Sequence, residues 1–254
     1  VSQALPVTAA FLTVSLLYAA SGFGLARKLF SHRRLCSSYV FGTFVGNYAF
    51  LGWGVLLIFW GEAALTRAVF FSMFFWPGFI VIGFFLVRLT NSGEGSGQGG
   101  KAPVTRLLLQ NASIPIGTVV LSLFCNFYRI VPPKPVWTVI DQFAGITVPL
   151  ILFAVGLSLK IRMPASDMKV VLLASAHRLI LGGLIGWLAA ELVGLLFPLD
   201  PLSVKVVVLQ AVMPTATMSP FFAAYSRMDD RLLGSIIAVS TLISLFTLPL
   251  WRIV

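Results

Sequence analysis

The chain consists largely of long apolar segments separated by short polar or charged connections. A helix that crosses a bilayer needs about 20 mostly apolar residues. Eight segments meet this requirement, covering residues 5–26, 35–59, 66–87, 107–127, 137–159, 170–196, 204–226 and 232–251. The expected fold is therefore an all-α polytopic membrane protein with about eight transmembrane helices.

Two of these segments contain residues that interrupt a helix. The segment 35–59 includes a glycine-rich stretch that begins at Gly46, and the segment 204–226 includes Pro214 and Pro220. Proline removes a backbone donor, and glycine loosens a helix. Because lipid offers no hydrogen-bond partners, such breaks persist at membrane depth only where protein or water covers them. A pair of broken helices is typical of the substrate site of a secondary transporter.

The composition supports a membrane protein with little soluble mass. Hydrophobic residues make up 58% of the chain and charged residues 10%, whereas a soluble domain carries roughly 25% charged residues. The net charge of +10 is first interpreted as a sign of topology, not of nucleic-acid binding. Cys36 and Cys125 are expected to be inert, and the absence of a charged leader before the first apolar stretch suggests a fragment or a trimmed chain.

The basic residues lie predominantly on one side of the predicted bundle. Cytoplasmic connections of membrane proteins are enriched in Lys and Arg, so this side is expected to face the cytoplasm. It carries Arg27, Lys28, Arg33, Arg34, Arg88, Lys101, Arg106, Lys160, Arg162, Lys169, Arg227 and Arg231. The other side carries Arg67, Arg129, Lys134, Lys205 and Arg252. In a cell membrane this orientation places the connection 91–102 inside and both ends of the chain outside.

The two interrupted segments occupy corresponding places in a predicted inverted repeat. Glu62 follows Asn47, and Asp229 follows Pro214, by 15 residues in each case, and an apolar segment comes after each acid. The first three segments then repeat as the last three with opposite orientation, as in known transporters; chance alignment of apolar segments is the alternative. The expected domains are a partial first repeat over 1–90, a flexible Gly/Ser linker over 91–102 and a second repeat over 103–254.

Three stretches resemble the auxin efflux carrier family, which includes bacterial malonate and malate permeases. They are GNYAFLGWG at 46–54, PLILFAVGLSL at 149–159, and LQAVMPTATMSPFFAAYSRMDD at 209–230, which is followed by STLISLFTLPL at 240–250. The last is the longest and most specific, and the resemblance covers nearly the whole chain. It implies ten spans in two inverted five-span repeats, with crossed broken helices at the fourth and ninth spans.

On this comparison the chain holds the third to the tenth spans, and the first two spans of the family are expected to be missing. The family's second glycine is Ala49 here, and its proline after the FLG run is Gly54. A glycine loosens a helix but keeps its N–H donor. The break near 46–54 is therefore predicted on weaker grounds than the break near 213–220.

The two breaks supply the candidate substrate-binding residues. Unwound helix ends present free N–H groups that favour a carboxylate, and Asn47 adds a side-chain amide. Gln210 lies one turn before Pro214, where it either lines the site or joins two helices. The candidate set is Gly46, Asn47, Gln210, Pro214, Thr215, Thr217 and Ser219. The alternative for the hydroxyls is that they only satisfy exposed backbone groups.

Four ionisable residues are candidates for ion coupling or for attracting an anion, namely Asp141, His177, Arg178 and Glu191. Arg178 lies roughly 12 Å into its segment, where it either attracts an anion or extends to the interface. Asp141 and Glu191 lie near segment ends, so a wetted interfacial position is the alternative to proton coupling. Both H+ and Na+ stay open as the coupling ion.

These features predict a secondary active transporter that moves a small organic anion, such as a carboxylate, by alternating access. The expected partners are this anion and the lipid bilayer, with a homodimer left open and no nucleic acid. A truncated transport-fold protein that senses a solute without moving it is the alternative. An intramembrane enzyme would need a convergent catalytic constellation, which two isolated histidines do not provide, so no enzyme activity, metal or cofactor is expected.

Overall fold

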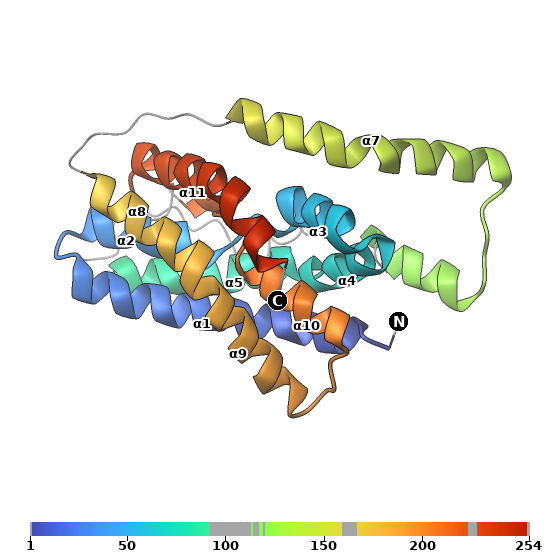
Figure 1. The fold of residues 1–254 in the computed structure, drawn as a ribbon, viewed down its shortest axis with the longest axis horizontal. Helices are drawn as coiled ribbons and strands as arrows, with labels where there is room; N and C mark the ends of the chain where they lie inside the picture. Colours follow the sequence, from blue (N-terminus) through green and yellow to red (C-terminus); the bar gives the residue numbers. More distant parts are fainter. Residues whose placement is uncertain are drawn as a thin grey trace.

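The computed structural model describes residues 2–91, 113, 117–118, 120–158, 167–222 and 228–252. Regular structure in these ranges is helical, with one isolated antiparallel bridge between Gly46 and Thr215. The elements are α1 (Ala4–Leu29), α2 (Arg33–Phe44), η1 (Tyr48–Gly52), α3 (Trp53–Trp60), α4 (Glu62–Ser72), α5 (Phe75–Asn91), α7 (Lys134–Ser158), α8 (Met168–Ala176), η3 (His177–Leu181), α9 (Gly182–Gly194), α10 (Pro201–Ala211), η4 (Ser219–Phe222) and α11 (Asp230–Trp251). The chain is an all-α polytopic membrane protein, as its apolar segments predict (Figure 1).

Three helices in the described part of the chain are long and apolar enough to cross a bilayer alone. They are α1, the continuous helix Met168–Gly194 formed by α8, η3 and α9, and α11. The pair α4 and α5 adds a fourth span when its 41° bend is taken as part of one helix. The linker 91–102 lies almost entirely outside the described residues, as does most of the first half of the predicted span 107–127.

The two interrupted segments form short half-helices, as their sequences predict. The first half of one segment, α2, ends at Phe44; Val45 is extended, and η1 and α3 continue the chain as the apolar helix Tyr48–Trp60. The other segment begins as α10 and ends at Ala211, because a proline at 214 clashes with the carbonyl four residues earlier and disfavours helix at the residue before it. Both breaks therefore have a local cause in the sequence.

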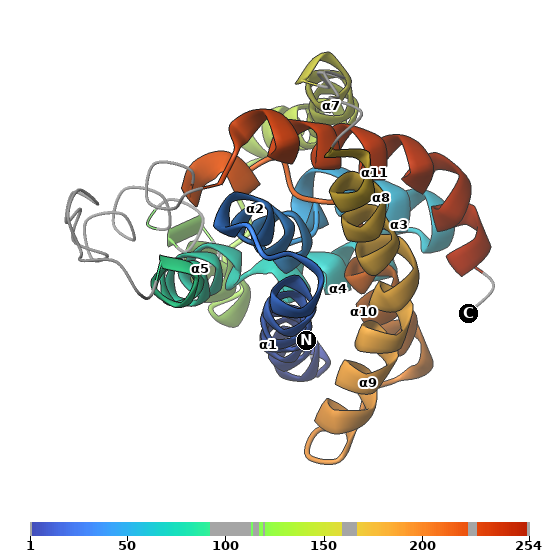
Figure 2. The ribbon, with the colours of Figure 1, turned by 90° about the vertical axis from the view of Figure 1, so that its left-hand side faces the viewer.

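Helix α1 lies along one side of the packed helices and contacts several of them. It packs against α2, α4 and α9, and against fewer residues of α5 (Figures 1 and 2). The side chains of Phe11, Val14 and Tyr18 on this helix are buried, whereas Leu12 and Leu16 are exposed. The exposed leucines suit contact with lipid, and the buried face holds α1 against both broken segments.

Helices α9 and α10 approach each other closely because a glycine lies in their interface. A Cβ atom at Gly186 would stand 2.7 Å from the Cβ atom of Ala211 and 2.8 Å from the Cα atom of Val208. Small residues of this kind allow membrane helices to pack backbone against backbone. The end of α10, where the second break starts, is thereby fixed against α9.

The helix Met168–Gly194 contains a π-helical turn, η3, over His177–Leu181. A π turn inserts extra backbone into an α-helix and is found mostly at functional sites. Here His177, Arg178 and Leu179 are all buried. The turn thus directs three consecutive side chains into the protein interior, which a regular helix on the bundle surface does not do.

Ion pairs join helices at the end of the bundle where α1 ends and α2 begins. This basic end carries Arg27, Lys28, Arg33 and Arg34. Arg34 of α2 pairs with Asp167 at 3.2 Å and with Asp229 at 2.5 Å, and these acids are the N-cap residues of α8 and α11. We name these three residues the basic-end clamp, because one guanidinium joins three helices.

A second clamp joins helices at the opposite end of the bundle. Arg67 of α4 pairs with Asp200 at 2.6 Å and donates from Nε to the hydroxyl of Ser203 at 3.0 Å. Asp200 is also the N-cap of α10, since its side chain accepts from the Ser203 N–H at 2.7 Å. The amide of Gln3 accepts from the Asp200 N–H at 3.1 Å, which adds the start of α1 to this opposite-end clamp.

The basic-end clamp predicts a pH-dependent contribution to stability. Partial burial raises the pKa of Asp229, but the Leu232 N–H and the charge of Arg34 outweigh burial, so its pKa lies below the ordinary value of 3.8. The stabilisation is therefore complete above the unfolded-state pKa and is lost as the pH falls through the folded-state value. Asp229→Asn keeps an N-cap but loses the ion pair, and should cost about 0.5–1 kcal/mol at neutral pH because Arg34 is half exposed.

Thermal unfolding of the purified chain in detergent, measured from neutral pH to about pH 3, tests this expectation. The wild type and the Asp229→Asn variant should differ at neutral pH and converge in acid. Asp230→Asn is the matched control, since it removes the neighbouring charge in the first turn of α11 and leaves the pair with Arg34 intact. A difference between the wild type and Asp229→Asn that does not change with pH would contradict the assignment.

Candidate functional site

The two helix breaks cross each other inside the protein. Gly46 and Thr215 form the isolated bridge, and beside it the N–H of Asn47 donates to the carbonyl of Pro214 at 2.8 Å. All four residues are buried. We use the term crossover for residues 45–48 and 213–216. Each break covers the backbone groups that the other exposes, which is the condition for unwound backbone in an apolar interior.

Further bonds complete the backbone of the second break. The N–H of Ala216 donates to the carbonyl of Val45 at 2.9 Å, on the other side of the bridge. The Thr215 hydroxyl donates to the carbonyl of Gly42 at 2.6 Å, and the Thr215 N–H donates to the hydroxyl of Ser240 at 3.2 Å. The Thr215 hydroxyl thus gives a partner to an exposed backbone carbonyl, which is the alternative role considered for the hydroxyls of this break. The Thr215 N–H has its own partner in Ser240.

The guanidinium of Arg178 lies against the crossover and is fully buried. Its Nε and Nη2 atoms donate to the carbonyl of Met213 at 3.0 and 2.7 Å, and Nη1 donates to the carbonyl of Thr43 at 3.3 Å. These carbonyls stand at the C-terminal ends of α10 and α2, whose last carbonyl groups lack helical partners. A cation is favoured at this end of a helix dipole, so one side chain caps both half-helices.

Two tyrosines provide the aromatic surroundings of this cation. The guanidinium carbon of Arg178 lies 4.1 Å from the ring centre of Tyr18 and 5.7 Å from that of Tyr48. The hydroxyl of Tyr18 donates to the carbonyl of Ala211, the last residue of α10, at 2.7 Å. A cation over an aromatic face is stabilised by about 0.5–2 kcal/mol, more when water is excluded. Tyr18 therefore stabilises the positive charge of Arg178 with its ring and binds the end of α10 with its hydroxyl.

His177 occupies the π turn next to Arg178 and bonds to two hydroxyl groups. Its Nδ1 atom lies 2.9 Å from the hydroxyl of Tyr39, and its Nε2 atom lies 3.0 Å from the hydroxyl of Ser21. These partners belong to α2 and α1. The imidazole links the π turn to both helices and fixes the direction from which Arg178 enters the crossover.

Arg178 faces no carboxylate in the described part of the chain. The ion pairs of Arg34 and Arg67 lie at the two ends of the bundle instead. Removing an unpaired charge from water costs several kcal/mol, and carbonyl and aromatic contacts offset only a part. A guanidinium has five N–H donors, and three of these make the bonds described above. The two others make no hydrogen bond with the described residues.

Several buried polar atoms around the crossover have no hydrogen-bond partner among the described residues. They are Nδ2 of Asn47, the hydroxyl of Tyr48, Oε1 of Gln210 and Oγ of Ser219. The other amide atom of Gln210, Nε2, donates to the carbonyl of Tyr48 at 3.3 Å. An unpaired buried polar atom costs about 1–3 kcal/mol, so this grouping calls for a ligand or water that supplies partners.

The structure separates the predicted site residues into two groups. Gly46, Asn47, Gln210, Pro214 and Thr215 come together at the crossover, with His177 and Arg178 beside them. Thr217 is half-buried, and Ser219 begins η4. Asp141 is exposed on α7 and Glu191 is exposed near the end of α9.

The side chain of Arg178, for which attracting an anion and extending to the membrane interface were both expected possibilities, is fully buried among the described helices. The sequence also gave no indication of Tyr18, Thr43 or Met213 as parts of the site. Two of these residues contribute through a backbone carbonyl, which no residue type signals. Tyr18 is separated from Arg178 by 160 positions and lies in an ordinary apolar segment.

The described residues contain no group of three or more His, Cys, Asp or Glu side chains arranged to hold a metal ion. The charge at the site is supplied by arginine and by helix ends. The fold and this site define a helical membrane protein in which two broken helices cross at a buried cation.

The comparison with known families agrees with this class. The profile of the family described as Membrane transport protein matches residues 106–252, more than half of the chain. The chain belongs to this family of membrane transporters. The match includes the second break but not the first.

Two curated relatives come from methanogenic archaea. An uncharacterized transporter of Methanothermobacter thermautotrophicus is 30% identical over 209 residues, which cover 82% of this chain and 64% of that protein. An uncharacterized transporter of Methanocaldococcus jannaschii is 27% identical over 213 residues, which cover 82% of this chain and 65% of the relative. The chain thus spans slightly under two thirds of the length of each relative.

The close approach at the crossover predicts a severe effect of a small substitution. A Cβ atom at Gly46 would stand 2.0 Å from Nη2 of Arg178 and 2.6 Å from Cε1 of Tyr48. Gly46→Ala should therefore displace the guanidinium and destabilise the fold by about 1–3 kcal/mol, the usual cost of overpacking. The measurement is the midpoint of thermal unfolding in detergent.

Gly24→Ala is the matched control for this substitution. Gly24 lies on the exposed side of α1, and a Cβ atom there meets nothing within 4 Å. Its replacement should leave the midpoint unchanged or raise it, since alanine is the better helix former. Equal midpoints for Gly46→Ala and the wild type would show that the backbone at the crossover does not contact Arg178 as described.

Proposed function

We propose that this chain is a secondary active transporter that moves a small organic anion, such as a carboxylate, by alternating access. The crossover is its substrate site. The observation that carries the proposal is the fully buried guanidinium of Arg178, which bonds to carbonyls at both breaks and faces no carboxylate in the described part of the chain. Ionisable groups inside a membrane protein usually mark a substrate or ion pathway.

An anion suits this site on electrostatic grounds. A carboxylate beside Arg178 would accept its two remaining N–H groups and supply the missing opposite charge. Charge-assisted hydrogen bonds of this type are stronger than neutral ones and bind a planar carboxylate in a defined orientation. The bound anion would also neutralise the guanidinium inside the low-dielectric interior, where an unpaired charge is most costly.

The unpaired polar atoms support the same location. The amide nitrogen of Asn47 and the hydroxyl of Tyr48 are donors, and the carbonyl oxygen of Gln210 is an acceptor. Donors suit a carboxylate, and an acceptor suits a hydroxyl or an amine on the same small molecule. These atoms stand on both breaks, so a ligand that satisfies them would contact both halves of the crossover.

The two clamps support a mechanism in which the ends open alternately. Arg34 closes the basic end by joining α2, α8 and α11, and Arg67 closes the opposite end by joining α4 to α10. Both pairs are partly exposed, and exposed ion pairs contribute only about 0–1 kcal/mol. Either clamp can thus open at a cost that a bound anion would compensate.

We propose further that the first and last groups of helices form an inverted repeat and that the basic end faces the cytoplasm, as the excess of Lys and Arg favours. The coupling ion stays open between H+ and Na+. Asp141 and Glu191 lie on exposed helix surfaces away from the crossover, so a coupling ion near the substrate would use the groups around His177 and Arg178 instead.

Uptake into proteoliposomes tests the function. The wild-type chain should accumulate radiolabelled small carboxylates from a panel of mono- and dicarboxylates. Arg178→Lys keeps the charge but has three N–H donors in place of five and lacks the planar fork that bonds the two carbonyls and a carboxylate together, so its uptake should fall at least about tenfold. Binding without uptake in the wild type would favour the alternative of a solute-binding sensor; absence of both would reject the carrier.

Binding measurements by calorimetry identify the site independently of transport. Asn47→Ala removes the unpaired amide at the crossover and should weaken carboxylate binding by about 1–3 kcal/mol. The control is Ser37→Ala. The Ser37 hydroxyl is also buried and unpaired, but Ser37 lies in α2, ten residues before Asn47. Wild-type affinity in Asn47→Ala, or equal losses in both variants, would place the substrate elsewhere.

A further inference from the structure

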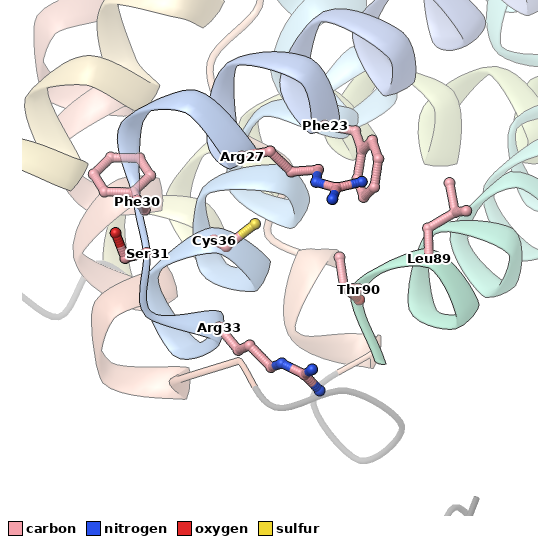
Figure 3. A pocket seen from close by; sticks show the side chains of 8 residues that line it. All are labelled: Phe23, Arg27, Phe30, Ser31, Arg33, Cys36, Leu89 and Thr90. Atoms are coloured by element: carbon pink, nitrogen blue, oxygen red, sulfur yellow. The ribbon is translucent and has the colours of Figure 1, made fainter. Parts of the chain in front are cut away.

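A cavity separate from the crossover opens at the basic end of the bundle. It has a volume of about 330 Å³ and lies between the end of α1, the start of α2 and the end of α5 (Figure 3). Arg27 and Arg33 contribute its charge, and its walls include the apolar side chains of Phe23, Phe30 and Leu89. Figure 3 shows both arginines extending into the space beside α5. The described lining includes no acidic residue.

We infer that this cavity binds the phosphate headgroup of an anionic membrane lipid. Guanidinium groups recognise phosphate through paired N–H bonds, and basic pockets between membrane helices are known places for acidic headgroups. Arg27 lies over the ring of Phe23, with 5.5 Å between the guanidinium carbon and the ring centre. That contact directs its charge along an apolar wall, where an acyl chain can lie.

The start of α2 gives independent support for an anion at this place. α2 begins with Arg33 and Arg34, has no acidic residue in its first turn and has no side-chain cap. Positive charge is unfavourable at the N-terminal end of a helix dipole, and an anion there is favourable. Arg34 is compensated by the acids of the basic-end clamp. Arg33 makes no ion pair in the described part of the chain, so a bound phosphate would provide the oppositely charged partner.

The depth of the cavity fits a lipid better than a free anion. α1 has 26 residues and is therefore roughly 39 Å long, more than the 30 Å or so of a bilayer's hydrocarbon core. Its last turn, which contains Arg27, then stands at the level of the headgroups. The hydroxyl of Thr90 already donates to the carbonyl of Leu86 at 2.9 Å, which leaves the two arginines as the donors of the cavity.

Thermal stabilisation of the purified chain tests the inference with three probes, namely dioctanoyl phosphatidylglycerol, dioctanoyl phosphatidylcholine and sodium phosphate. Phosphatidylglycerol should raise the unfolding midpoint saturably, and phosphatidylcholine should not. In Arg27→Gln/Arg33→Gln the half-saturating concentration should rise at least about tenfold, because charge-assisted bonds are lost. Lys28→Gln/Arg231→Gln removes the same charge at exposed positions outside the lining and should behave as the wild type.

Cys36 offers a second readout that needs no arginine variant. It lines the cavity and is a free, half-buried thiol, and Cys125 is a free, half-buried thiol elsewhere in the chain. Phosphatidylglycerol should slow alkylation of Cys36 by a maleimide and leave Cys125 unaffected. Unchanged alkylation, unchanged affinity in the arginine variant or an equal loss in the control variant would overturn the inference. Equal half-saturation by sodium phosphate would show that the site takes free phosphate and not a lipid.

Discussion

The contact of one buried guanidinium with the ends of two broken helices is the interaction on which the crossover depends. Helix α2 and helix α10 both stop inside the protein, and each would leave carbonyl groups without partners there. Arg178 donates hydrogen bonds to carbonyls at both ends, and the two unwound segments donate backbone hydrogen bonds to each other. The absence of a side chain at Gly46 is the steric condition for this arrangement.

The same contact ties the two halves of the chain together. Thr43 belongs to the first half and Met213 to the second, so the bonds of Arg178 resist any displacement of one half-helix from the other. Under the proposed alternating access, an anion at the guanidinium would not merely add a ligand. It would accept the two remaining N–H groups and attract the guanidinium, and could thereby change how firmly Arg178 holds the carbonyls at the ends of α2 and α10.

The sequence predicts the features that have local causes. Apolar length predicts the helices, and Pro214 predicts the end of α10, because a proline disturbs the residues just before it. The partners of Arg178 are not predictable in this way, since they are a ring in α1 and carbonyls whose positions depend on the whole fold. The repeat pattern brought Asn47 and Pro214 into correspondence, but the bond between them is visible only in three dimensions.

Rigid half-helices connect the crossover to the clamps at the ends of the bundle. α10 has 11 residues, a length of about 16 Å, with the Asp200 clamp at its first turn and Tyr18 and the crossover at its last. The last turns of this short helix pack closely against α9 at Gly186. The clamps are partly exposed and weak, whereas the crossover is buried and strongly bonded. Under the proposed alternating access, movement would therefore begin at the ends, with the crossover as the pivot.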